Sequence, residues 1–529
     1  MIATRRKFLA TAGTAAAATL VGCKKSRARF TGRIVGAASA DGHRIRTRNF
    51  PAPTETLQTG IVIAGGGIAG LAAARRLDQQ GAGDFILIEL EGETGGNSAC
   101  GRNSISAYPW GAHYVPLANE ESTEVLRLFQ ELEIIRGRDA NGVPIYDEEY
   151  LCAEPMERLF DAGRWQGGLL PQIGISTSDR RQYDGFFARM DSFRSMRGGD
   201  GKPAFAIPLD LSSRDPALLA FDRESMAEWM TRQGWDSAPL HWHVDYCCRD
   251  DYGAGVAHVS AWAGIHYFAS RRGRAANAEP DAVVTWPEGN GWLAARLAQP
   301  LADRIRSRCV IFNLQQDGES VLVDFFDLRR ERSVRVQTRG VVCAMPRFIA
   351  QHVVRDLPSE NDLQYSPWMV ANITLDDLPD GNGAPLAWDN VARGSASLGY
   401  VVATHQNLQP VPRETVLTHY WPLDLAAPRA EREQALARSY GDWCDLIMTD
   451  FKAMHPGIES HIRNIDIWLW GHGMIRPVPG FIWGEARQRM QRSLGRIVFA
   501  HSDMSGISIF EEAFIRGTEA ADALLSLIS

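Results

Sequence analysis

Residues 60–77 have the sequence GIVIAGGGIAGLAAARRL, which carries the strongest signal for the fold class. The β-branched apolar run 61–64 is typical of a buried parallel strand, and residues 71–77 are good helix formers. After glycines at positions 81 and 83, a second apolar run at 85–89 predicts another strand. Strand, helix and strand in this order form the βαβ unit of an α/β protein with a Rossmann-like domain.

Of the four glycines in residues 65–70, three match the pattern GxGxxG between the first predicted strand and the helix. Gly65 permits a tight turn, and Gly67 lets the backbone approach a pyrophosphate. Gly70 lets helix and strand pack closely. The backbone amides at Ile68 and Ala69 open the helix, where free N–H groups and the positive dipole end attract phosphate. The constellation predicts a dinucleotide site.

An acidic residue, Glu89, ends the second predicted strand. At this position a carboxylate can accept hydrogen bonds from both hydroxyls of an adenosine ribose. The same carboxylate would repel a 2′-phosphate, so NADP is disfavoured. The βαβ unit alone does not separate FAD from NAD.

The next residues, ELEGETGGNS at 89–98, place the pair Gly95–Gly96 after the acidic strand end. Near the C-terminus the chain reads FAHSD at 499–503 and FEEAFIRGTEAA at 510–521. Together with GNGW at 289–292 and VVCAMP at 341–346, these motifs resemble the flavin-dependent amine oxidase superfamily. That superfamily includes polyamine oxidases, protoporphyrinogen oxidases and phytoene desaturases. The resemblance implies FAD as the cofactor.

The resemblance also assigns roles in the C-terminal motifs. Asp503 would hold the ribityl chain, although an ungapped match would put Ser502 at that acidic position. The amides around Glu511, Glu512 and Ala513 would face the flavin. A helix N-terminus near the pyrimidine edge would stabilise the anionic reduced ring.

Several positions depart from the family pattern. The family usually has an arginine after the Gly-Gly pair, where this chain has Asn97, with Arg102 the nearest substitute. Asn372 falls roughly where many amine-oxidising members carry a lysine near the flavin. The remaining lysines of the body, Lys202 and Lys452, are expected at the surface. The flavin site is therefore supported by the motifs, and amine chemistry is not.

Candidate catalytic residues lie in one of the motifs and in two further segments. His501 is the favoured acid/base candidate because histidine titrates near neutral pH, although a mere hydrogen-bonding role is equally open. His113 and Tyr114, in an aromatic loop, could meet substrate or simply pack. Residues 247–267, which include Asp250, are a candidate substrate pocket.

No metal or disulfide framework is predicted. His241 and His243 have metal-ligand spacing, but no second cluster of comparable quality accompanies them. The eight cysteines contain no CxxC pair and are expected to be mostly buried thiols.

The N-terminus reads TRRKFL at 4–9 and LVGC at 20–23, which resemble a twin-arginine export signal and a lipobox. We expect a signal at 1–23, a polar tether at 24–59, export by the twin-arginine translocase, and a periplasmic protein anchored to the membrane through Cys23. The alternative for the first motif is an accidental arginine pair in a disordered leader. The alternative for the second is a lipobox that matches by chance. After this N-terminal stretch, the sequence contains no run of about twenty consecutive apolar residues, so no membrane span is predicted.

The 529-residue chain is too long for one core, and its net charge of −7 gives no reason to expect nucleic acid as a partner. Segments 60–115, 285–350 and 490–529 are predicted to form an FAD-binding domain of the glutathione-reductase type. Residues 116–284 and 351–489 are predicted to form a mixed α+β substrate domain interleaved with it.

These observations predict an FAD-dependent oxidoreductase that oxidises a small organic substrate, an amine being one candidate, by hydride transfer to flavin N5. The acceptor of the electrons would be O₂ or a quinone. One alternative is a desaturase or dehydrogenase that passes electrons to a quinone or protein partner. Another is a flavin-binding protein without turnover.

Overall fold

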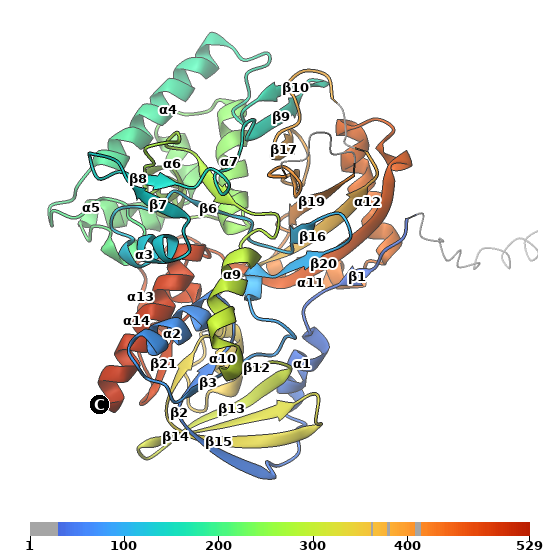
Figure 1. Ribbon diagram of the computed structural model, residues 1–529. Coiled ribbons are helices and arrows are strands. Elements are labelled where there is room, and N and C mark those ends of the chain that lie inside the picture. Colours follow the sequence, from blue (N-terminus) through green and yellow to red (C-terminus); the bar gives the residue numbers. More distant parts are fainter. Residues whose placement is uncertain (1–29, 361–362, 378–380, 408–413) are drawn as a thin grey trace, which may run out of the picture.

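A computed structural model describes residues 30–360, 363–377, 381–407 and 414–529. The predicted signal and lipobox at 1–23 lie outside the described residues. Over the described residues the chain forms two large sheets, three two-stranded sheets and the helices that pack around them (Figure 1). Within the described ranges, no helix is both long and apolar enough to cross a bilayer.

The first sheet has seven strands in the order β12-β3-β2-β15-β14-β13, with β21 paired to β15. Its strands come from three separated parts of the chain and form the lower part of Figure 1. The strand β15 is continuous over twelve residues and pairs with β2, β14 and β21. The bounds are β2 (Glu55–Ala64), β3 (Phe85–Ile88), β12 (Ile305–Arg306), β13 (Cys309–Asp317), β14 (Ser320–Asp327), β15 (Arg332–Cys343) and β21 (Ile497–Phe499).

The predicted βαβ unit is present as β2, α2 (Ile68–Gln79) and β3. A Cβ at Gly70 would overlap the carbonyl oxygen of Gly65, so glycine is required where the helix meets the strand. A Cβ at Gly517 would likewise overlap the carbonyl oxygen of Ala69. This glycine lets the last helix, α14 (Phe510–Ile528), lie directly against α2.

The second sheet has eight strands in the order β1-β20-β16-β19-β18-β17-β9-β10. Its strand β16 is buried along almost its whole length, as expected for the centre of a sheet covered on both faces. Helices α11 (Pro428–Ala437) and α12 (Tyr440–Met454) belong to this part of the chain. The bounds are β1 (Ile34–Val35), β9 (Glu157–Asp161), β10 (Arg164–Gly167), β16 (Tyr365–Leu375), β17 (Asp389–Ala392), β18 (Tyr400–Val402), β19 (Thr415–Pro422) and β20 (Ile462–Ile475).

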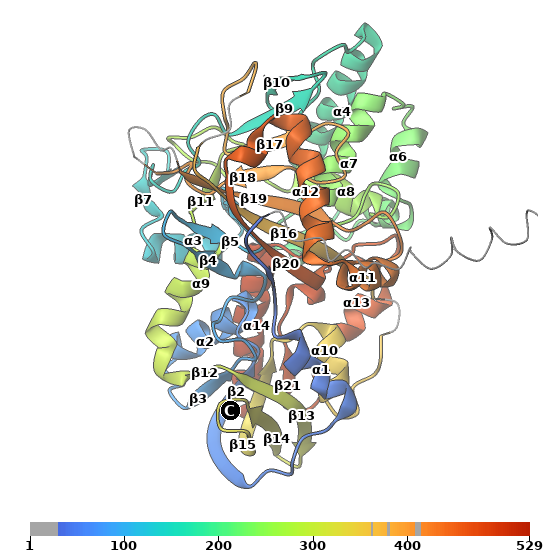
Figure 2. The same ribbon diagram turned by 90° about the vertical axis from the view of Figure 1, so that its right-hand side faces the viewer.

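A helical layer flanks the second sheet, as Figure 2 shows from the side. Ser176 and Ser225 cap two of its helices through reciprocal capping boxes. Residues 216–232 form α5, a 3₁₀ turn and α6 in succession. The helices are α4 (Thr177–Ser195), α5 (Pro216–Leu219), α6 (Met226–Arg232), α7 (Ala238–Tyr252) and α8 (Ala261–Ala269).

The expectation of a tether at 24–59 needs correction for its described part. Residues 31–59 contain β1, the helix α1 (Ser39–Thr47) and the first half of β2. The two residues of β1 are too few to produce a periodic pattern, and they form a strand because β20 offers them a free edge.

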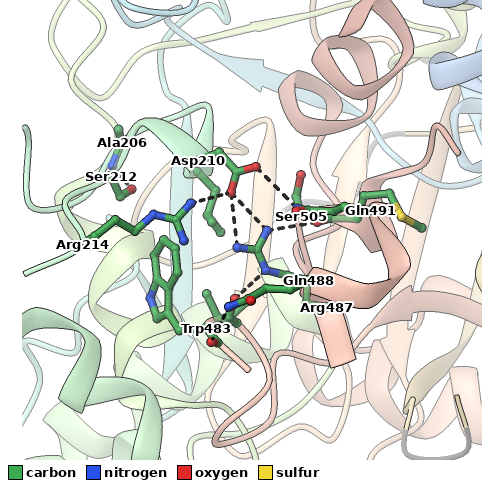
Figure 3. A network of polar contacts seen from close by, with 12 residues as sticks. Ala206, Asp210, Ser212, Arg214, Trp483, Arg487, Gln488, Gln491 and Ser505 are labelled. Atoms are coloured by element: carbon green, nitrogen blue, oxygen red, sulfur yellow. Dashed lines mark hydrogen bonds and ion pairs between the residues drawn. The ribbon is translucent and has the colours of Figure 1, made fainter. Parts of the chain in front are cut away.

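A network of arginines joins the helical layer to the C-terminal helices (Figure 3). Nη1 and Nη2 of Arg487 both lie 3.2 Å from Oδ1 of Asp210, and Arg516 of α14 donates to Oδ2 at 2.6 Å. Burial alone would raise the pKa of Asp210, but Arg516 and Arg487 outweigh it and lower that pKa. The network fixes the position of α14, whose N-terminus borders two cavities.

Candidate functional site: a dinucleotide cavity that opens into a substrate chamber

A cavity of about 1030 Å³ lies at the carboxyl ends of β2, β3 and β15. In open α/β sheets this edge is where nucleotides bind. Nine of the predicted cofactor residues line the cavity, and so does the catalytic candidate His501; the nine are Gly65, Gly67, Ile68, Ala69, Glu89, Gly95, Gly96, Asn97 and Ala513.

The glycine loop adopts the conformation that its sequence requires. Gly65 and Gly95 have positive φ angles of 108° and 135°, which favour glycine. No side chain caps α2 at Gly67, so the first amides of the helix remain available to an anion. A Cβ at Gly67 would meet no atom closer than 3.9 Å. The space beside Gly67 is thus open to a ligand.

Glu89 is anchored at the cavity wall by the backbone. Its Oε2 accepts a hydrogen bond from Gly66 N at 2.6 Å, and its Oε1 accepts one from Glu91 N at 2.8 Å. Burial raises the pKa of Glu89. Each oxygen keeps a second lone pair for a ribose hydroxyl.

A second cavity, of about 140 Å³, adjoins the first, and we call this second cavity the chamber. The two cavities share seven lining residues: Asn97, Ala112, Asn290, Trp470, Ser508, Ile509 and Phe510. The last three precede or begin α14, so the positive end of that helix stands at the junction. A flat ring bound at the junction would contact both spaces.

The predicted C-terminal residues face different ways. Ala513 lines the cofactor cavity and Glu511 lines the chamber, with its pKa raised to about 7 by burial. Glu512 lines neither, because its Oε1 accepts from Leu209 N at 2.6 Å on the far side of α14.

Ser502 lines the cofactor cavity, whereas Asp503 does not. Oδ2 of Asp503 accepts hydrogen bonds from Arg347 N at 2.8 Å and from Tyr365 Oη at 2.6 Å. Burial alone would raise the pKa of Asp503, but His501 and these donors lower it. Asp503 therefore stabilises the fold behind the cavity, and the ungapped match to Ser502 fits the geometry better.

His501 lies on the cofactor side of the junction and does not line the chamber. Its Nδ1 is 3.0 Å from Oδ1 of Asp503 and 3.1 Å from Asp503 N. The ring is thereby held against the cofactor cavity.

Arg102 is not near the phosphate site: its side chain is 78% exposed and lies 3.8 Å from Glu288. Asn97 lines both cavities and donates to the carbonyl oxygen of Gly473. Among the described residues that line the cofactor cavity, none is a lysine or an arginine. Backbone amides at helix ends would therefore carry the phosphates.

The chamber has aromatic walls and acidic groups. Trp368, Tyr420 and Trp470 project from the central strands β16, β19 and β20. Asp250 and Asp251 stand in the last turn of α7, an unfavourable place for carboxylates because the helix dipole is negative there. Unfavourable charges of this kind concentrate at functional sites.

Of the two aspartates, only Asp251 is paired with a cation. Arg271 donates to Oδ1 of Asp251 at 2.6 Å. Asp250 accepts a hydrogen bond from Tyr114 Oη at 3.2 Å. Burial and the neighbouring Asp251 raise the pKa of Asp250 to about 7. Asp250 can therefore exchange a proton near neutral pH.

His113 and Tyr114 both line the chamber. The ring of His113 stacks on Tyr420 with centroids 4.5 Å apart, and burial lowers the pKa of His113 to about 4. His113 is therefore neutral at physiological pH. Burial and Asp250 raise the pKa of Tyr114, which acts as a hydrogen-bond donor.

Neither lysine of the body lines a cavity. Lys202 is exposed, and Lys452 lies 3.5 Å from Glu459 at the surface. Asn372 is buried and does not line the chamber, although it shares a face of β16 with Trp368 and Val370; it donates to Pro109 O at 3.0 Å and accepts from Thr418 Oγ1. Trp368 and Val370, on the same strand, line the chamber instead.

The described part of the chain contains no group of three or more His, Cys, Asp or Glu that could hold a metal ion. His241 and His243 lie on α7, and His241 Nε2 is 2.8 Å from Trp235 O. The seven cysteines within the described ranges are free thiols.

A profile of the NAD(P)-binding Rossmann-like domain family matches residues 63–132. Among curated proteins, the oxidoreductase PigB of Serratia sp. (strain ATCC 39006) is 22% identical over 297 residues. That match covers 50% of this chain and 41% of PigB, so the chain spans less than half of that relative's length.

Solved structures with a similar fold include two amine oxidases. Putrescine oxidase bound to putrescine superposes with a TM-score of 0.63 at 14% identity, over 89% of this chain and 100% of the other. Cyclohexylamine oxidase from Brevibacterium oxydans IH-35A superposes with a TM-score of 0.63 at 15% identity, over 88% of this chain and 99% of the other. The CLA-producing fatty acid isomerase from P. acnes superposes with a TM-score of 0.59 at 14% identity, over 88% of this chain and 98% of the other. The predicted fold class is thereby confirmed.

Proposed function

We propose that this chain is an FAD-dependent oxidoreductase that oxidises a small organic molecule. The observation that carries the proposal is the junction of the two cavities. A long cavity with a dinucleotide fingerprint opens into an aromatic, acidic chamber beside the N-terminus of α14. Its backbone amides and Glu89 fit a pyrophosphate and a ribose. The similarity to PigB and to two amine oxidases supports this function.

Bound FAD would supply a hydride acceptor at the junction. The chain supplies the surroundings of the substrate. Trp368, Tyr420 and Trp470 would exclude water and pack against the substrate's apolar part. Asp250, oriented by Tyr114, would accept the proton that the substrate loses as it is oxidised.

The purified protein is expected to be yellow and to release FAD rather than FMN on denaturation. The cavity extends from the junction to Glu89, which a mononucleotide would leave half empty. Chromatography and mass spectrometry of the released flavin check this. A colourless wild-type protein that also fails to bind added FAD would contradict the proposal.

An amine is the first substrate class to try, because three carboxyl groups and a single arginine line the chamber. None of the described residues that line the chamber is a lysine, and this observation favours a second function, that of a desaturase or dehydrogenase. Anaerobic mixing with amines, amino acids and alcohols, followed by O₂ or a quinone, separates these functions. Flavin that no compound in a broad panel bleaches would instead favour a binding protein without turnover.

We also propose that the protein is exported by the twin-arginine translocase and anchored in the periplasm through Cys23. The support is the sequence of residues 4–23 alone. Several acyl chains on one cysteine would suffice for stable anchoring.

A further inference from the structure

The segment 31–47, which comprises β1 and α1, precedes the dinucleotide fingerprint, and we call it the N-terminal clasp. Figures 1 and 2 show it passing from the second sheet to the region beside α10 (Arg347–Val353) in the cofactor domain. We propose that the clasp is part of the cofactor site, where it covers the adenosine half of a bound dinucleotide and retains it. This inference rests on the FAD site proposed above.

One end of the clasp is fixed to the second sheet. Strand β1 pairs in parallel with β20, with Ile34 opposite Ile467. Before it, Thr31 O accepts hydrogen bonds from Ile465 N at 2.9 Å and from Tyr440 Oη at 2.7 Å. The strand pairing and these two hydrogen bonds anchor the clasp to the second sheet.

The other end is fixed to the cofactor domain. Ile45 of α1 is 7% exposed and belongs to the same core as Val310 and Phe326. The guanidinium carbon of Arg44 lies 4.3 Å from the centroid of the Phe326 ring, a cation–π geometry. The clasp thus spans both domains.

Between its anchors the clasp forms a wall of the cofactor cavity. Ala37, Gly42 and Ile45 line that cavity, together with Leu90 and Val310. These side chains are apolar and suit the faces of a purine ring.

The clasp is also bonded to the segment that would hold the ribose. Ala38 N donates to Oε1 of Glu91 at 2.7 Å, and Glu91 N donates in turn to Glu89. Burial raises the pKa of Glu91. The clasp therefore meets the cavity at the end where Glu89 stands, opposite the junction with the chamber.

Two consequences follow for the ligand. A dinucleotide seated between the clasp and Leu90 can leave only after the clasp undocks, whereas a mononucleotide at the junction does not reach it. By linkage, a ligand that the clasp holds must stabilise the clasp by the same free energy.

The test compares the release of FAD from two variants. Ile45→Ala weakens the anchor of the clasp to the cofactor domain, and Ala38→Pro removes the N–H donor to Glu91. Ala38 has φ −67°, which proline adopts without strain. Ile458→Ala is the matched control, since Ile458 is 4% exposed in the core of the second sheet. After dilution, rising FAD fluorescence should report release about tenfold faster in both clasp variants, and within about twofold of wild type in the control.

Trypsin gives a second readout on the wild-type protein. Cleavage after the exposed Arg46 and Arg48 should be slowed by FAD and by ADP, and not by FMN. If both clasp variants release FAD at the wild-type rate, or if FAD does not slow tryptic cleavage, the proposed role of the clasp is wrong while the proposed function stands. A wild-type protein that binds no FAD would overturn the proposed function and this inference with it.

Discussion

Gly67→Val is expected to give a folded protein that no longer retains FAD. The φ of Gly67 is −70°, which any residue can adopt, and a Cβ there would meet no atom within 3.9 Å. The valine methyl groups would instead occupy the space that a pyrophosphate needs in front of α2. We expect affinity to fall at least about a hundredfold, about 2.7 kcal/mol. Equilibrium titration of the apoprotein with FAD measures this.

The neighbouring Gly70→Ala provides the contrast. A Cβ at Gly70 would overlap the carbonyl oxygen of Gly65, so this variant should lose stability and cofactor together. Thermal unfolding of both apoproteins separates the two effects. An apo Gly67→Val that melts several degrees below apo wild type, or one that binds FAD normally, would contradict the assignment of the pyrophosphate position.

The cofactor half of the site was predictable from sequence because its requirements are local. Gly65, Gly67 and Glu89 lie on one βαβ unit, where strand and helix periods fix which atoms meet. At the C-terminus the prediction of Asp503 as the ribityl ligand does not fit, and Ser502 lines the cavity instead. Ser502 and Asp503 lie in the 3₁₀ turn Ser502–Met504, where three residues complete a turn, so a shift of one residue changes which side chain faces the cavity.

The chamber could not be predicted in this way. Its walls come from β16, β19 and β20, which are distant in sequence and meet only in the folded sheet. Strand β16 is buried on both faces, so its pattern does not reveal where along the strand the chamber ends: Trp368 and Val370 line it, and Asn372 on the same face does not. Asp250 was within a candidate pocket segment, but its partner Tyr114 is 136 residues away.

Asp250→Asn is expected to slow flavin reduction about a hundredfold, about 2.7 kcal/mol of barrier, while FAD stays bound. Asp250 can accept a proton only when it is ionised, and its pKa is raised to about 7 by burial and Asp251. In wild type the rate should therefore rise as the pH increases through about 7 and level off above it. Asparagine keeps an acceptor for Tyr114 but cannot take a proton, so the dependence on pH should disappear. Stopped-flow reduction across pH 5–9 measures both effects.

Glu511→Gln is the matched control, because Glu511 lines the same chamber and its pKa is also raised to about 7. Whatever its absolute rate, this variant should keep the rise through about pH 7 if Asp250 is the proton acceptor. Loss of the rise in Glu511→Gln, with its persistence in Asp250→Asn, would transfer the role to the carboxyl group at the start of α14. The result would then place proton transfer at the junction itself, where the positive end of that helix favours the ionised form.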